Sequence, residues 1–248
     1  MKKVAVVTST IGRKTLLDTI ESVKKQTVPC RHYVFVHGTE FHKKAKDILQ
    51  HHSDVEAIYL PNNNGNPNYG MAPVYAAAPY IVSEDYIFYL DDDNFFETNH
   101  VQSLVEHIEN HQLDWAFSLR RIVADDGKYI CDDDCESLGY FSNLSNTNLV
   151  DNSCFALKTV TAREHASSWY YPVVSDRKFM AALFEGKKRC GCTGLATVNY
   201  RLSKDGSNSV NAETFLKCNE RMKELLSGQL PWRKPSINGY QAMHVQFV

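Results

Sequence analysis

The first hundred residues alternate between short apolar runs and stretches of helical periodicity, and this alternation constrains the fold most strongly. Lys3–Thr8 is a continuous run rich in β-branched residues, as in a strand buried on both faces. Lys14–Gln26 follows with apolar residues at helical spacing. The pattern then repeats, with strands expected at His32–Val36, Val55–Leu60 and Tyr86–Leu90, and helices at Phe41–His51, Met71–Ile81 and Glu97–His111. This order predicts an α/β fold, a mostly parallel sheet flanked by helices.

The rhythm changes after residue 112. Trp115–Leu119 resembles a strand, and Asp125-Asp126-Gly127 separates two short strand-like runs, Arg121–Ala124 and Lys128–Cys131, in a hairpin pattern. Glu136–Asn148 is irregular. Strands are expected again at Ser153–Leu157 and Leu195–Leu202, and helices at Ser175–Glu185 and Asn211–Leu226.

We therefore expect one domain in two halves, followed by a tail. Residues 1–112 form a mostly parallel half, and residues 113–228 form a mixed half that ends in a helix. The tail, residues 229–248, has no clear assignment. Ser175 or Asp176 is available to cap the helix that begins there.

Composition and charge exclude several classes of function. The chain has 248 residues and a formal net charge of −2, so it has no positive field that would recruit nucleic acid or an anionic membrane. Its apolar start is too short for a signal peptide, and the later apolar stretch Met71–Val82 contains two prolines and is far shorter than a membrane span. We expect a cytoplasmic protein without a transmembrane segment, whose seven cysteines are reduced.

The acidic run Asp91-Asp92-Asp93-Asn94 follows directly on the apolar strand Tyr86–Leu90. The carboxyl edge of an open α/β sheet is where ligands bind. If the chain stays extended there, Asp91 and Asp93 point to one side and Asp92 to the other. Two carboxylates directed at one point repel unless a cation lies between them, and hard oxygen ligands suit Mg²⁺ or Mn²⁺. The alternative is an acidic turn that caps the following helix.

Two other segments have two readings each. A second acidic run, Asp132-Asp133-Asp134, follows a short hairpin strand and is predicted to be a solvated loop, with contact to an acceptor or a metal as the alternative. The aromatic run Trp169-Tyr170-Tyr171-Pro172 could form a platform for an acceptor sugar or pack in the core.

A strand that ends in Leu-Asp-Asp-Asp-Asn after three βα units resembles the family 2 glycosyltransferases of GT-A fold and their Asp-x-Asp motif. The similarity extends over most of the chain. Its further segments, in order, are Val4–Arg13, Ser22–Thr27, Asn63–Pro67 with Tyr69-Gly70, Val150–Phe155 and Ser175–Phe179.

The resemblance implies inverting transfer of a sugar from a nucleoside-diphosphate sugar, with a UDP-sugar favoured, to a glycan or glycolipid acceptor in surface glycan assembly. A glycolipid acceptor would bring peripheral association with a membrane. Asp91 and Asp93 would hold Mn²⁺ or Mg²⁺, Asp176 would be the catalytic base, and Asp151 is the second candidate for the base. The residues assigned to the donor nucleotide are Thr8, Thr10, Arg13, His37, Asn64, Tyr69, Asp91, Asp92 and Arg201, with Lys204 beside Arg201.

Some positions have alternative roles, and two depart from the family pattern. Asp176 could be a helix cap, and Asp151 could fix a loop. His37 stands where the family usually has an acidic residue that reads the base, and Ser203 stands where a histidine often adds a metal ligand.

Two other functions use similar features. A nucleotidyltransferase has a related sheet but normally opens with a Gly-rich loop, whereas Thr8–Arg13 contains one glycine. A binding protein that has lost the chemistry would be consistent with His37 and Ser203.

Overall fold

The computed structural model describes residues 2–65, 68–135, 150–172, 174–203 and 211–237. The predicted irregular segment Glu136–Asn148 and the predicted diphosphate contact Lys204 lie outside these residues. The strands are β1 (Val4–Thr10), β2 (Cys30–Val36), β3 (Val55–Tyr59), β4 (Tyr86–Tyr89), β5 (Phe95–Phe96), β6 (Trp115–Val123), β7 (Tyr129–Asp132), β8 (Phe155–Lys158) and β9 (Cys190–Arg201).

The helices are α1 (Leu16–Lys24), α2 (Thr39–Leu49), α3 (Ala72–Ile81), α4 (His100–His111), α5 (Thr159–Glu164), α6 (Ser175–Glu185) and α7 (Ala212–Leu225). Three short 3₁₀ turns are η2 (Asn152–Cys154), η3 (Ala166–Trp169) and η4 (Pro231–Arg233). No helix within the described ranges is long and apolar enough to cross a bilayer.

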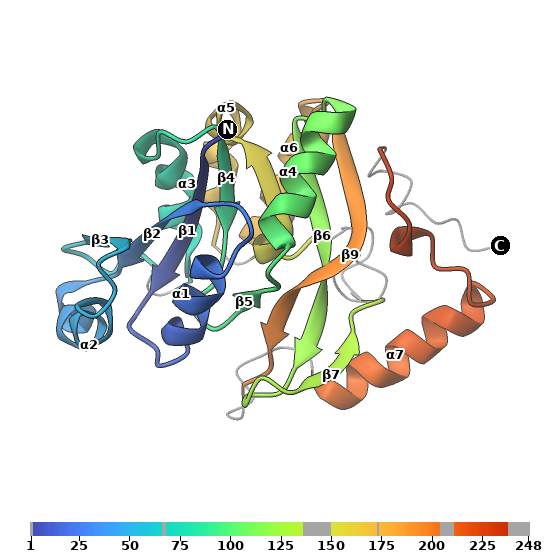
Figure 1. Ribbon diagram of the computed structural model, residues 1–248, viewed down its shortest axis with the longest axis horizontal. Helices are drawn as coiled ribbons and strands as arrows, with labels where there is room; N and C mark the ends of the chain where they lie inside the picture. Colours follow the sequence, from blue (N-terminus) through green and yellow to red (C-terminus); the bar gives the residue numbers. More distant parts are fainter. Residues whose placement is uncertain (1, 66–67, 136–149, 173, 204–210, 238–248) are drawn as a thin grey trace.

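One twisted sheet runs through the molecule in the order β3-β2-β1-β4-β8-β6-β9-β5, with β7 paired to β6 (Figure 1). Among the described residues, six of its nine strands run in the same direction, and β5, β7 and β8 run against them. The prediction of a mostly parallel sheet in an α/β fold is therefore confirmed. The carboxyl ends of β1, β2 and β4 meet at one edge, because these strands pair in parallel.

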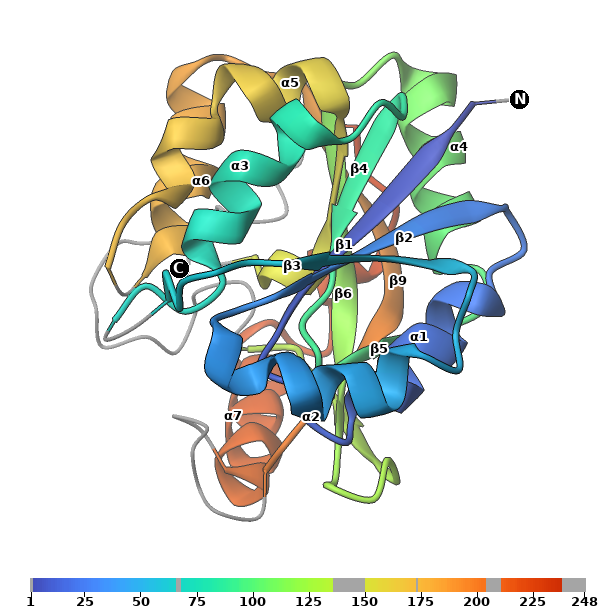
Figure 2. The ribbon, with the colours of Figure 1, turned by 90° about the vertical axis from the view of Figure 1, so that its left-hand side faces the viewer.

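Helices cover both faces of this sheet. Figure 2 shows α3, α5 and α6 on one face and α1 and α4 on the other. The strands between these layers are buried on both sides, as the apolar run at the start of the chain predicts, and Val4–Val7 is almost fully buried. Burial of each such side chain contributes roughly 1.5–3 kcal/mol. A separate apolar cluster joins α1 and α2 to β2 through Leu16, Ile20, Val34, Val36, Ala45 and Leu49.

One predicted element boundary was wrong. β9 begins at Cys190 rather than Leu195, and two glycines in this part of the strand conceal it in the sequence. The final described segment lies against these glycines: a Cβ on Gly191 would lie 2.6 Å from the carbonyl oxygen of Ser236. A Cβ on Gly194, which has a φ of +72°, would lie 2.9 Å from the carbonyl carbon of Lys234 and 3.0 Å from the carbonyl oxygen of Arg233.

Helix α6 begins where it was predicted, but its predicted cap is wrong. The N-cap residue is Val174, with a left-handed φ of 51°, and it makes no side-chain capping bond. Asp176 lies in the first turn, where its carboxylate accepts a hydrogen bond from the N–H of Arg177 (2.8 Å). The carboxylate of Asp176 therefore does not have the role of a cap.

The prediction of a solvated loop at Asp132-Asp133-Asp134 is also wrong. Asp133 and Asp134 are buried. Asp133 accepts a hydrogen bond from Nε of Arg120 (2.9 Å), and Asp134 accepts one from Nε1 of Trp232 (2.8 Å) and one from Nε of Arg233 (2.6 Å). The counter-charges come from distant parts of the chain, so the acidic run looks unpaired in the sequence. The hydrogen bonds of Trp232 and Arg233 to Asp134 also hold the start of the predicted tail against the domain, where Trp232 is fully buried.

The buried histidine of α4 predicts a dependence of stability on pH. His100 lies 2.8 Å from Oγ1 of Thr197, and burial lowers its pKa from 6.5 to about 3. The unfolded chain therefore takes up this proton more readily than the folded chain. The stability contribution is present above pH 6.5 and is lost as the pH falls from 6.5 toward 3. Its slope is at most about 1.4 kcal/mol per pH unit.

Urea unfolding between pH 7 and pH 4.5 measures this slope. His100→Gln should make it shallower by an amount approaching that limit, whereas His111→Gln, on the exposed side of the same helix, should leave it unchanged. Equal slopes for wild type and His100→Gln would contradict the prediction.

Candidate active site

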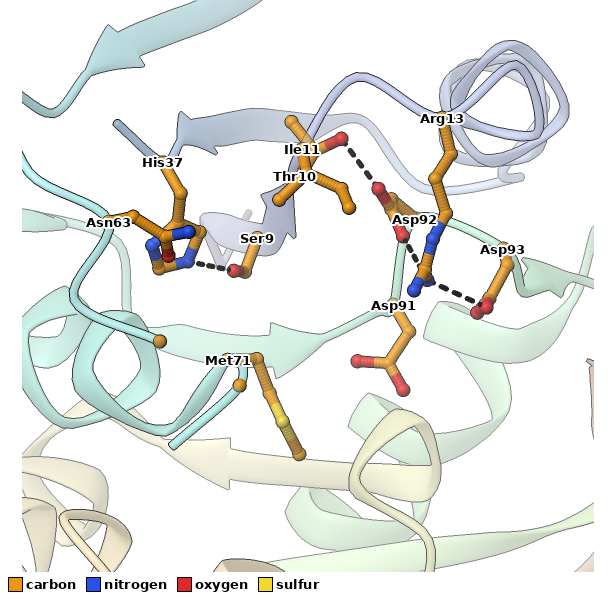
Figure 3. A pocket seen from close by; sticks show the side chains of 12 residues that line it. Ser9, Thr10, Ile11, Arg13, His37, Asn63, Met71, Asp91, Asp92 and Asp93 are labelled. Atoms are coloured by element: carbon orange, nitrogen blue, oxygen red, sulfur yellow. Dashed lines mark hydrogen bonds and ion pairs between the residues drawn. The ribbon is translucent and has the colours of Figure 1, made fainter. Parts of the chain in front are cut away.

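A cavity of about 420 Å³ lies at the carboxyl ends of β1, β2 and β4. Two lining residues belong to the end of β1, six to the loops that follow these three strands and four to the loop after β3, as expected for an open α/β sheet. Figure 3 shows the lining residues, which are Ser9, Thr10, Ile11, Arg13, His37, Asn63, Gly65, Gly70, Met71, Asp91, Asp92 and Asp93.

The three aspartates after β4 take different directions. Asp92 is 4% exposed and turns toward β1, where it accepts hydrogen bonds from the hydroxyl of Thr10 (2.6 Å) and from Nη1 of Arg13 (2.9 Å). The same Nη1 lies 2.9 Å from Oδ2 of Asp93. Asp91 points away from this pair (Figure 3). Arg13, which lies in the β1–α1 loop, therefore links Asp92 to Asp93.

Asp91 is held by neutral donors. Its Oδ1 accepts hydrogen bonds from the hydroxyl of Tyr75 on α3 (2.9 Å) and from Nδ2 of Asn152 in η2 (2.8 Å). Burial, with the charges of Asp93 and Asp151, raises the pKa of Asp91 well above its ordinary value.

Asp93 is perturbed in the same direction. Burial and the charge of Asp92 raise its pKa to about 6, against the opposing effect of Arg13. Burial and the neighbouring carboxylates therefore disfavour the ionised forms of Asp91 and Asp93. A cation would favour these ionised forms.

The donor set fits a divalent ion that is shared with a substrate. Mg²⁺ and similar ions are commonly held by one or two carboxylates together with phosphate oxygens and water. Asp91 and Asp93 supply such carboxylates beside an open cavity. Within the described parts of the chain, no group of three or more His, Cys, Asp or Glu side chains is placed to hold a metal. The ion would therefore depend on ligands from the substrate.

The chain matches the model of the family "Glycosyl transferase family 2" over residues 5–148. It belongs to this family. The expected GT-A fold and membership among the glycosyltransferases are thus confirmed. No curated protein sequence matches the chain significantly.

Solved structures with the same fold include S. aureus TarS 1–349 in complex with UDP-GlcNAc, with a TM-score of 0.61 and 14% identity over 94% of this chain and 68% of that one. TarS 1–349 without a named ligand has a TM-score of 0.59 and 13% identity over 80% of this chain and 60% of that one. The complex of TarS 1–349 with UDP has a TM-score of 0.58 and 13% identity over 92% and 72%. This family 2 chain covers 60% of the length of the TarS 1–349 structure without a named ligand.

The turn that carries the acidic motif of this family 2 chain is fixed by Asn94 and Arg201. Oδ1 of Asn94 accepts a hydrogen bond from the backbone N–H of Arg201 (3.0 Å). The guanidinium of Arg201 donates from Nε to the carbonyl oxygen of Asp93 (3.0 Å) and from Nη2 to Asp18 (2.6 Å). These bonds hold the backbone under the carboxylates, and the predicted contact of Arg201 with a diphosphate stays a prediction.

The residues predicted to bind the nucleotide differ in position. Thr10 and Arg13 line the cavity, but the buried hydroxyl of Thr8 lies 2.9 Å from Nε2 of His32 on the neighbouring strand. Nε2 of His37 lies 2.6 Å from the hydroxyl of Ser9, and burial lowers the pKa of His37, so the ring is neutral at pH 7.

The loop after β3 lines part of the cavity and also packs on another segment through the ring of Tyr69. Asn64 is exposed, and its neighbours Asn63 and Gly65 line the cavity. Tyr69 stacks on Tyr170, with ring centroids 4.9 Å apart. The contact joins this loop to the segment that precedes α6.

The two predicted catalytic acids have different surroundings. Oδ2 of Asp151 accepts a hydrogen bond from Nη1 of Arg120 (2.5 Å), and Oδ1 accepts one from the N–H of Ser153 (2.9 Å). Asp151 thus caps η2. Asp176 is half-buried and lies one turn before Phe179, which stacks on Trp169 at 4.3 Å.

The aromatic run before α6 is divided between the core and the surface. Trp169 is fully buried and contacts the ring of Tyr75, so it belongs to the core, whereas Tyr170 and Tyr171 are exposed. A role for the two tyrosines toward an acceptor stays a prediction.

Sequence reasoning missed several residues of the site. Tyr75 and Asn152 hold Asp91, and Ser9 and Met71 line the cavity. One signal was available: Tyr75 is the large polar-tipped residue on the buried face of an Ala-rich helix. The others stand beside predicted residues without a pattern of their own.

The buried ion pairs behind the site predict a large effect of one substitution. Arg120 joins Asp133 and Asp151, and all three side chains are almost fully buried. Arg120→Met leaves two buried carboxylates without this counter-charge, which should cost about 3–5 kcal/mol of unfolding free energy.

Arg121→Met is the matched control. This adjacent arginine pairs with Glu97 at a partly exposed position, so its loss should cost at most about 1 kcal/mol. Urea unfolding measures both variants, and a similar loss in the two would show that the Arg120 pairs contribute little.

Proposed function

We propose that this chain is a metal-dependent, inverting glycosyltransferase that moves a sugar from a nucleoside-diphosphate sugar, with UDP favoured, to an acceptor hydroxyl. The observation that supports this most is the turn of Asp91, Asp92 and Asp93 beside the cavity, in a chain of family 2. Assembly of a surface glycan on a glycan or glycolipid acceptor, and a cytoplasmic location with peripheral membrane association, are parts of the same proposal.

Asp91 and Asp93 would hold Mn²⁺ or Mg²⁺ with the donor diphosphate. The ion would stabilise the negative charge that develops on the diphosphate as the anomeric C–O bond breaks. Tyr75 and Asn152 orient Asp91, and Thr10 orients Asp92. Arg13 lines the same cavity, and a guanidinium suits phosphate oxygens.

The base that accepts the proton of the acceptor is proposed to be Asp176. Both carboxylate oxygens of Asp151 already accept strong hydrogen bonds, one of them from a buried arginine, so Asp151 is less available for a proton. Phe179 and Trp169 tie α6 to Tyr75, which contacts Asp91. This packing supports a place for the first turn of α6 on the acceptor side.

His37 is proposed to contact the base of the nucleotide. His37 lines the cavity, and a neutral imidazole offers one donor and one acceptor. UDP and UDP-GlcNAc are bound in TarS structures of the same fold, so UDP-GlcNAc is the first donor to test.

A thermal-shift titration tests the donor site. UDP-GlcNAc with Mn²⁺ should raise the melting temperature more than either alone, because only ligands of the folded state stabilise it, by about 2.7 kcal/mol at a hundredfold excess over Kd. Asp93→Asn should remove the metal-dependent part of this shift. Asp47→Asn, an exposed acid on α2, is the control and should keep it.

Hydrolysis of the donor completes this test. If no donor among UDP-, GDP-, TDP- and CMP-sugars is bound or hydrolysed with Mn²⁺ or Mg²⁺, and Asp93→Asn changes nothing, the enzyme proposal fails.

A kinetic comparison tests Asp176. Asp176→Asn should lower kcat by at least about a hundredfold and leave donor affinity nearly unchanged, because a general base acts on the acceptor. Glu185→Gln, at the exposed end of the same helix, should keep full turnover. Normal turnover in Asp176→Asn would exclude Asp176 as the base.

A further inference from the structure

Arg13 already occupies the position of a cation between two carboxylates of the site. Its Nη1 lies 2.9 Å from Oδ1 of Asp92 and 2.9 Å from Oδ2 of Asp93. Figure 3 shows the guanidinium reaching across from the β1–α1 loop to both side chains. The positive charge needed between neighbouring carboxylates is thus supplied by the chain itself.

The two carboxylates are not held equally. Asp92 is buried and also accepts a hydrogen bond from Thr10, so it has a second anchor in β1. The Asp93 side chain is 33% exposed and faces the cavity. Of the two contacts, the one between Arg13 and Asp93 is therefore the easier to break.

The backbone at this position is fixed, whereas the side chain of Arg13 is half exposed. Gly12 has a φ of +74°, and a Cβ there would lie 2.9 Å from the backbone nitrogen of Ala45, so the loop is packed closely on α2. The N–H of Gly12 donates to Oγ1 of Thr10 (2.8 Å). The Arg13 side chain beyond this anchor is 49% exposed. It can change direction without movement of the loop.

The positive charge of a guanidinium beside Asp93 repels a divalent cation at the same carboxylate. It would favour the phosphate oxygens of a donor in the same cavity, to which arginine can bind through two N–H groups. We propose that Arg13 is an internal counter-ion that holds Asp93 until a donor diphosphate arrives and then leaves Asp93 for the diphosphate, so that metal and donor bind as a coupled pair. This inference rests on the proposed function.

Direct titration of Mn²⁺ tests the inference without any turnover, with the EPR signal of free Mn²⁺ as the readout. In the absence of nucleotide, Arg13→Gln should bind Mn²⁺ about tenfold more tightly than wild type, because the competing charge is gone. Arg13→Lys keeps the charge and should remain within about threefold of wild type.

UDP should tighten Mn²⁺ binding strongly in wild type, and Mn²⁺ should tighten UDP binding by the same factor. In Arg13→Gln this coupling should be smaller, since Asp93 is free from the start and the diphosphate lacks its arginine. Lys14→Gln removes the same charge from the next, exposed residue and should behave like wild type.

Three results would overturn the inference. If wild type binds Mn²⁺ with UDP, but Arg13→Gln matches it both without nucleotide and in the coupling, Arg13 does not compete with the metal, and the proposed function still stands. If Lys14→Gln gains as much Mn²⁺ affinity as Arg13→Gln, the effect depends on net charge and not on the position of Arg13. If no variant binds Mn²⁺ even with UDP, the metal site itself is absent and both proposals fail.

Discussion

Repulsion among three carboxylates at the end of a buried strand is the constraint around which the site is organised. The apolar strand β4 ends at one edge of the sheet, and Asp91, Asp92 and Asp93 follow it there. Burial limits the solvation of Asp91 and Asp93 by water. These carboxylates accept hydrogen bonds from Thr10 and Arg13 on one side and from Tyr75 and Asn152 on the other. Three segments thus converge on one turn. Tyr75 and Asn152 donate to the same oxygen of Asp91, whereas Thr10 donates to Asp92 and Arg13 contacts both Asp92 and Asp93. The charge that remains is the basis of the metal site proposed above.

The parts of the fold that could be predicted from the sequence are those set by local pattern. The parallel half followed from apolar runs that alternate with helical periodicity, and α6 was expected at its observed bounds. β5, two residues long, and the glycine-containing start of β9 carry no such pattern. Their pairing depends on neighbours distant in the chain. The acidic run Asp132–Asp134 was misjudged for the same reason, since its partners Arg120 and Arg233 are fixed by tertiary structure.

The site shows the same limit at the level of single residues. The position of the Asp91–Asp93 turn followed from the end of an apolar strand, which is a local signal. The partner of each carboxylate did not: sequence alternation pairs Asp91 with Asp93, whereas Arg13 pairs Asp92 with Asp93. Arg201 was expected among the ligands of the donor, and its bonds to the carbonyl oxygen of Asp93 and to Asp18 emerge only in three dimensions.

The close packing of Gly191 and Gly194 against the final described segment has a consequence for the comparison of related sequences. A side chain at either position would occupy space now filled by backbone atoms of residues 233–236. A relative with larger residues at both positions cannot place its tail in this way, and its Asp134 would then lose the contacts with Trp232 and Arg233. The two glycines, with an acid at 134, therefore serve as a sequence marker that identifies which relatives share this C-terminal arrangement.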